Sequence, residues 1–156
     1  MDARFVNCYL KGAQAVFRTM LRIDLEMGKP ALKADHKASG DITGVIGFAG
    51  DKRGSFTISL RRECALAIYN AFTGEDKKEV NEEVVDAVGE LTNIISGQTR
   101  LELEKIGFNI SASLPTVIIG RDVDINMITK APIITLPFSF GSNGNAGEIF
   151  IDFSFE

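Results

Sequence analysis

The sequence predicts an α+β fold in which long helices pack on one face of an antiparallel sheet. Apolar residues recur every three or four positions in some segments, as in amphipathic helices, and every second position in others, as in half-buried strands. The clearest strand segments come in pairs separated by polar, glycine-containing turns, which indicates β-hairpins and therefore antiparallel pairing.

The first half of the chain predicts one helix followed by strands. Residues 2–22 have the helical spacing, and a Gly-Lys-Pro break follows them. Residues 31–37 predict a short irregular strand. Residues 42–49 and 55–60 predict a hairpin around the polar turn 50–54.

The second half begins with two helices. Residues 61–74 predict a short helix that ends at Gly74, since glycine suits the left-handed conformation after a helix. Asn81 is a good N-cap, and acidic residues follow it, as the helix dipole favours. The long helix that starts there should run to about residue 105 and stop at Gly107.

Strands complete the second half. Residues 109–120 predict a strand that is interrupted or bent at Pro115, and residues 134–140 and 149–155 predict a hairpin around the turn 141–147. A long helix followed by antiparallel strands thus occurs twice. We expect one domain, residues 1–156, built from two pseudo-repeated halves that each contain a helix and strands.

The composition excludes several classes of protein. Of the 156 residues, 45% are hydrophobic and 24% are charged, as in ordinary globular proteins. The net charge of −4 argues against a nucleic-acid partner. The apolar runs are too short to span a bilayer, and we expect no signal peptide, because the start has an acid at position 2 and no long apolar stretch. We therefore expect no membrane association and a cytoplasmic location.

The chain has few residues that suit metal or nucleophilic chemistry. Cys8 and Cys64 lie in apolar helical patterns, which favours buried, reduced thiols, and His36, the only histidine, lies in a polar stretch, which favours the surface. We expect no intrinsic metal or cofactor and no catalytic triad.

The long helix carries an unusual polar stripe. At about 100° per residue, Asp86, Glu90, Asn93 and Gly97 fall on the side opposite the apolar stripe, and Gly89 lies beside Asn93. An exposed helix face is commonly polar, so simple solvation is one reading. However, two glycines and an asparagine sacrifice roughly 2 kcal/mol of helix preference. Such a local cost often marks a functional site, and bare backbone suits the close approach of a partner.

The order of these residues resembles a known signature. The run D-x-x-x-E-x-x-N from Asp86 to Asn93, followed by Pro115, is similar to that of the CheC/CheX/FliY family of chemotaxis phosphatases, and the length and the start MDARFVNC resemble its CheX branch. Some members carry two E-x-x-N helices. Here the first helix has Arg4 and Asn7 at that spacing, so the resemblance implies one site per chain.

The resemblance implies a phosphatase that removes phosphate from the aspartate of a CheY-like response regulator. Asn93 would position the attacking water, and Glu90 would contact the regulator's lysine. The regulator would supply Mg²⁺. Asp86, Gly89 and Gly97 would border the docking surface, although Asp86 could equally be a solvated acid.

The same residues also allow other functions. Glu90 could act as a general base, although the negative charge of the phosphoryl group disfavours a carboxylate there. The chain could instead be a non-catalytic module that binds a receiver domain or a flagellar-switch component. A small-molecule-binding domain has the least support, because the sequence lacks a glycine-rich phosphate loop.

We also expect a homodimer. The last hairpin is long and apolar and ends almost at the terminus, so its outer strand would need another strand or a cover. A second copy could pair with that edge, as the resemblance to CheX also implies. Alternatively, the first helix or residues 31–37 could cover it.

Overall fold

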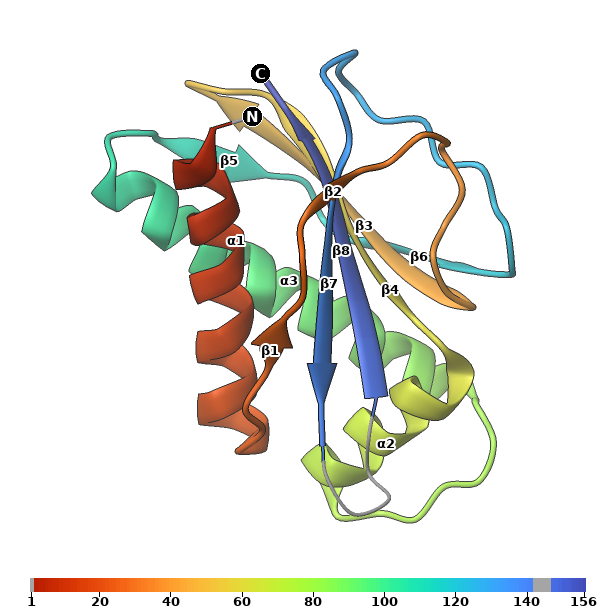
Figure 1. Cartoon of the computed structure of the whole chain (residues 1–156). Coiled ribbons are helices and arrows are strands. Elements are labelled where there is room, and N and C mark those ends of the chain that lie inside the picture. The colour runs from red at the N-terminus through yellow and green to blue at the C-terminus, as the bar shows by residue number, and fades with distance from the viewer. Residues whose placement is uncertain (1, 142–146) are drawn as a thin grey trace.

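Helices cover one face of an antiparallel sheet in the computed structural model, which describes residues 2–141 and 147–156 (Figure 1). Helix α1, Ala3–Val16, and helix α3, Glu82–Lys105, pack against each other. Helix α2, Arg62–Thr73, contacts α3 near the start of α3. The predicted α+β class, with long helices on an antiparallel sheet, is confirmed.

The sheet has eight strands in the order β1-β7-β8-β4-β3-β5, with β2 also paired to β7 and β6 also paired to β3. All of these pairs are antiparallel. The strands are β1 Glu26–Met27, β2 Ala31–Leu32, β3 Ile42–Gly50, β4 Gly54–Leu60, β5 Ile110–Ala112, β6 Thr116–Ile119, β7 Ile134–Phe140 and β8 Gly147–Phe155.

The predicted elements agree well with those observed. The predicted helix 2–22 is α1 continued by a π-helical turn, η1 Phe17–Leu21, which ends at Arg22 in the left-handed conformation. Gly74 and Asn81 occupy the predicted capping positions, and the Val84 N–H donates to the Asn81 side chain over 3.1 Å. The predicted strand 109–120 is divided into β5 and β6. Most of the predicted turn 141–147 lies outside the described residues.

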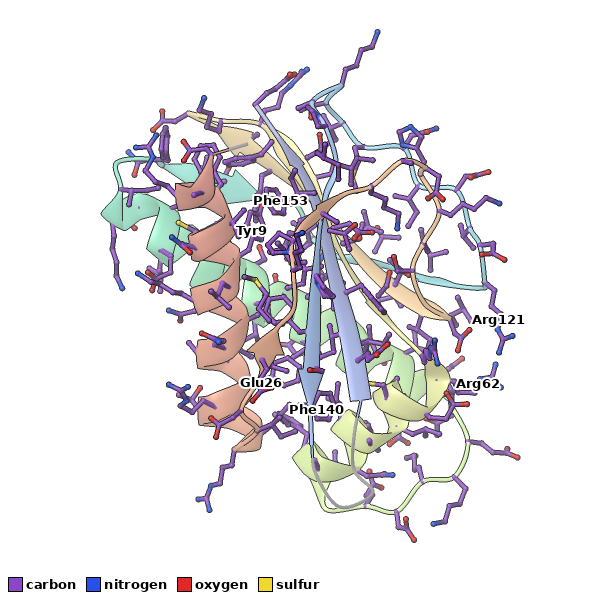
Figure 2. The ribbon with its side chains drawn as sticks, viewed as in Figure 1. Tyr9, Glu26, Arg62, Arg121, Phe140 and Phe153 are labelled. Atoms are coloured by element: carbon purple, nitrogen blue, oxygen red, sulfur yellow. The ribbon has the colours of Figure 1, made fainter. Side chains whose placement is uncertain are left out.

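The core lies between the sheet and the helices. Every second residue of β3, β4, β7 and β8 faces the helices, and most of these residues are buried and apolar. Tyr9 of α1 is buried among them, and its ring stacks on that of Phe153 of β8 with the centroids 4.2 Å apart (Figure 2). The expected oily face of each hairpin strand is confirmed.

The opposite face of the sheet is also buried, although much of it is polar. Long connections cross it and bond to the strand side chains. Lys33 forms a 2.8 Å ion pair with the buried Asp152, and the hydroxyls of Thr129 and Ser154 are 2.6 Å apart. Hydrogen bonding compensates most of these polar atoms for their loss of water, although Oδ1 of Asp152 has no partner among the described residues. The strand pattern alone did not predict this second covered face.

The structure contradicts the edge expected at the last hairpin. Strand β8 is central, because it pairs with β4 on one side and with β7 on the other. The outer edge of β7 is partly covered by β1 and β2. Of the predicted strand 31–37, only residues 31–32 are a strand, and this segment provides the cover that was the alternative to a dimer.

Candidate active site on helix α3

The polar stripe predicted on the long helix is present on α3. Asp86, Glu90 and Asn93 are exposed, and Gly97 is half-buried. Within the described part of the chain, the side chains of Glu90 and Asn93 form no hydrogen bond and no ion pair with other residues. Both groups are therefore free to meet a partner, and the helix places them one turn apart.

Gly89 does not have the exposed position that the sequence predicted. It is buried, and a Cβ atom added there would lie 3.2 Å from Cγ2 of Val117 in β6. The expectation of bare backbone beside Asn93 is therefore wrong for Gly89, which instead lets α3 approach the sheet. Pro115 lies just before β6, so the break at this proline starts the strand on which Gly89 packs.

Two further glycines set the position of α3. A methyl group at Gly44 of β3 would overlap the side chain of Thr92, the neighbour of Asn93. A Cβ atom at Gly12 of α1 would lie 2.5 Å from Oγ1 of Thr99. The sheet and α1 thus approach α3 more closely than a side chain would allow. Gly44 was not among the residues predicted to matter, although glycine inside a strand signals such an approach.

The start of α3 is tied to α2 by a cluster of polar side chains. The single proton of the Tyr69 hydroxyl is shared between the carboxylates of Glu75 and Glu83, with the Glu83 oxygen 2.8 Å away. Nζ of Lys77 lies 3.3 Å from the same carboxylate of Glu83. The hydrogen bond from Tyr69, followed by that from Lys77, lowers the pKa of Glu83 below its usual range. Hydrogen bonding to Glu75 is the main cause that raises the pKa of Tyr69. These contacts link α2 and the connection that follows it to the first turn of α3.

The first helix presents a different pair at the same spacing. Arg4 and Asn7 of α1 are exposed, as on α3, but the Arg4 guanidinium pairs with the N-cap residue Asp2 at 2.8 Å. A cation therefore occupies the place that corresponds to Glu90. The structure gives α1 no acidic group beside Asn7 at this spacing.

The free pair on α3 suits the positioning of a reactant. The amide of Asn93 can both donate and accept a hydrogen bond and carries no charge, whereas Glu90 offers a carboxylate to a cation. Among the described residues, no three His, Cys, Asp or Glu side chains are grouped to hold a metal ion. No helix in this part of the chain is long and apolar enough to cross a bilayer.

The cysteines and the histidine lie where the sequence predicted. Cys8 and Cys64 are free and buried, and burial raises the pKa of both thiols, that of Cys64 to about 12. A thiol with so high a pKa remains protonated near neutral pH and is a poor nucleophile. His36 is exposed. None of the three lies on the polar stripe.

Two sequence comparisons identify relatives. Residues 42–139 match the family model described as chemotaxis phosphatase CheX. The chain is 33% identical over 137 residues to the protein named CheY-P phosphatase CheX from Thermotoga maritima, an alignment that covers 85% of this chain and 88% of that protein.

Solved structures agree with this assignment over nearly the whole length. The crystal structure of the chemotaxis protein CheX from Vibrio vulnificus superposes with a TM-score of 0.85 at 37% identity, covering 97% of this chain and 99% of that one. The crystal structure of the CheX–CheY–BeF₃–Mg²⁺ complex from Borrelia burgdorferi superposes with a TM-score of 0.80 at 26% identity, and the match covers 97% of each chain. The sequence match and the shared fold together show that this chain belongs to the CheX family of chemotaxis phosphatases.

Proposed function

We propose that this protein hydrolyses the phosphoaspartate of a CheY-like response regulator. The observation that carries the proposal is the exposed Glu90–Asn93 pair, which has no side-chain partner among the described residues and lies on a helix held by close contacts. The Thermotoga maritima relative is named a CheY-P phosphatase, and the Borrelia burgdorferi relative was solved with CheY. Both names support the same substrate.

Asn93 acts by positioning the attacking water. Its carbonyl accepts a hydrogen bond from the water and its NH₂ group donates to a phosphoryl oxygen. The water oxygen then bonds to phosphorus, the bond from phosphorus to the aspartate oxygen breaks, and inorganic phosphate leaves. Positioning and electrostatics supply most of the catalysis in phosphoryl transfer, so a neutral amide is sufficient. The response regulator brings the Mg²⁺, and the reaction takes place in the cytoplasm.

Glu90 serves mainly to engage the regulator's lysine. It is exposed and unpaired in the described structure, so this ion pair can form on docking. Glu90→Ala should therefore raise KM for the phosphorylated regulator about tenfold, which corresponds to about 1.4 kcal/mol, with kcat nearly unchanged. A fall in kcat alone would assign Glu90 a chemical role, such as that of general base.

Asp86 and Gly97 border the surface that the regulator covers. Asp86 lies one turn before Glu90, and the described structure gives its side chain no partner. A Cβ atom at Gly97 would have only Arg100 near it, at 3.9 Å, so the backbone there is open to close approach. Gly89 contributes indirectly, through the packing of α3 on β6.

The test of this function is phosphate release from a phosphorylated receiver domain. Wild-type protein should accelerate the decay of at least one CheY-type receiver of the source organism, and Asn93→Ala should not. Circular dichroism and thermal unfolding should show that the variant is folded. If wild-type protein binds phosphorylated receivers without accelerating their decay, the chain is an interaction module and the proposed reaction is wrong.

A homodimer formed through the sheet remains part of the proposal, but at another edge. In the described residues, β5 and β6 pair with β3 and have no strand on their outer side. Leu114 between them and Ile119 of β6 are exposed apolar residues on this edge. Pairing with the same edge of a second copy would give hydrogen-bond partners to the unpaired backbone N–H and C=O groups of this edge. Sedimentation equilibrium should show twice the 17.0 kDa chain mass, whereas a single species of one chain would refute the dimer.

A further inference from the structure

An apolar groove of about 340 Å³ lies between η1, α2 and α3. Its lining includes Ala87, Leu91 and Ile94 from α3, Phe72 from α2, and Met20 from η1. Phe72 is 54% exposed and Met20 is 39% exposed. Two large apolar side chains that remain in water beside an apolar hollow indicate a surface that a partner covers.

The groove is continuous with the candidate active site. Asp86 and Glu90 of the polar stripe also line it, and Ile94 directly follows Asn93. Along a helix, Ala87 and Asn93 are separated by about 9 Å, at about 1.5 Å per residue. A typical protein interface covers about 800 Å² on each partner, which corresponds to a patch about 30 Å across. A receiver that brings its phosphoaspartate to Asn93 therefore also covers the groove.

The groove is formed before any partner binds. Its α2 and α3 walls are joined by the hydrogen bond from Tyr69 to Glu83. Asn70 also holds the connection between the two helices, because its side-chain amide bonds both the carbonyl and the N–H of Lys77, at 3.0 and 2.9 Å. A preformed hollow binds at a lower entropic cost than one that must be ordered.

The charges at the rim indicate the chemistry of the occupant. Glu83, Asp86 and Glu90 stand along the α3 wall. Glu83 is bound by Tyr69 and Lys77, but Asp86 and Glu90 form no ion pair within the described residues. An apolar side chain would fill the hollow, and a lysine or arginine beside it would complement Asp86, while Glu90 meets the regulator's lysine.

We propose that this groove seats an apolar side chain, flanked by basic residues, from the surface of the phosphorylated receiver domain. The inference rests on the proposed function and adds a second docking point to Asn93. The groove supplies affinity for the receiver, whereas Asn93 supplies the rate of the chemical step.

The experiment compares Phe72→Ser and Met20→Ser with the control Leu32→Ser. Leu32 is also exposed and apolar, but it lies on β2, away from the groove. Steady-state dephosphorylation of a CheY-type receiver should show KM raised about tenfold for Phe72→Ser, less for Met20→Ser, and unchanged for Leu32→Ser, with kcat preserved in all three. Circular dichroism verifies that each variant is folded.

Binding without catalysis provides a second measurement. The receiver activated with BeF₃ and Mg²⁺ should bind Phe72→Ser with the same fold loss in affinity as the change in KM. The inference is overturned if wild-type protein is active and Phe72→Ser retains its KM and its affinity. It is also overturned if the groove variants change only the sedimentation mass, since the occupant would then be a second copy of the chain. Complete inactivity of wild-type protein would instead refute the proposed function.

Discussion

Helices α1 and α3 offer a comparison within one molecule. They pack against each other beside the same sheet, and each exposes an asparagine preceded, three residues earlier, by a charged residue. On α1 the charged residue is Arg4, which is already paired with Asp2 in the first turn of the helix. On α3 it is Glu90, in the middle of the helix and unpaired within the described residues. If Glu90 and Asn93 act as proposed, the spacing alone does not make a site, because the two pairs differ in the sign of the charge and in its freedom from a partner.

The two helices also differ in how they are held. Helix α3 is in close contact with both α1 and the sheet, through Thr99 and Thr92. The Arg4–Asn7 pair lies instead near the start of α1, where helix ends fray most readily. The water-positioning role proposed for Asn93 needs a rigid support, which the close contacts of α3 supply.

The largest expected effect separates the two asparagines. Asn93→Ala should lower stimulated dephosphorylation about 100-fold or more, as the loss of one positioned hydrogen-bonding group commonly does. Asn7→Ala, the matched change on α1, should leave the rate within twofold of wild type. Both rates are measured as phosphate release at saturating phosphorylated receiver. Equal losses of rate for the two variants would show that the two helices are functionally alike and would refute the difference between Asn93 and Asn7.

The next effect concerns the support of α3. Gly44→Ala would force the added methyl group against Thr92. We therefore expect the free energy of unfolding to fall by about 1–3 kcal/mol, which is typical of substitutions that overpack a core. Activity should also fall, because Asn93 adjoins the displaced residue. Chemical denaturation and phosphate release measure the two effects. Gly44→Ala with wild-type stability and activity would show that the close contact is not required.

The smallest effect has the opposite sign. Gly97→Ala adds a side chain in open space on α3, so the free energy of unfolding should rise by up to about 1 kcal/mol through helix preference. If the receiver approaches this backbone closely, the same change should raise KM. Denaturation and steady-state kinetics on one preparation measure both. A more stable variant with unchanged KM would remove Gly97 from the docking surface.

Much of the fold could be predicted because periodicity reports burial directly. The helices and the two hairpins follow from the apolar spacing. The exposed positions of Glu90 and Asn93 follow from the rotation of about 100° per residue along a helix. Gly89 was misplaced because glycine has no side chain whose polarity would assign it to a face. Its burial is set by Val117, which is distant in sequence.

Pairing order could not be predicted in the same way. Alternation predicts that residues 149–155 form a strand, but not that this strand lies between β4 and β7. Strands β1 and β2 have two residues each, too few for any period. The groove likewise depends on Met20 and Phe72, which periodicity treats as ordinary members of two separate helices and which only the tertiary fold brings together.

The two threonine contacts of α3 restrict which insertions and deletions the protein can tolerate. Thr92 and Thr99 are seven residues apart, about two helical turns, so they meet the sheet and α1 with a fixed rotation and a fixed translation. One residue inserted between Asn93 and Thr99 would rotate one contact by about 100° relative to the other. Either the contact with α1 or the direction of Asn93 would be lost. Length changes are therefore confined to the loops, and this part of α3 can vary only by substitution.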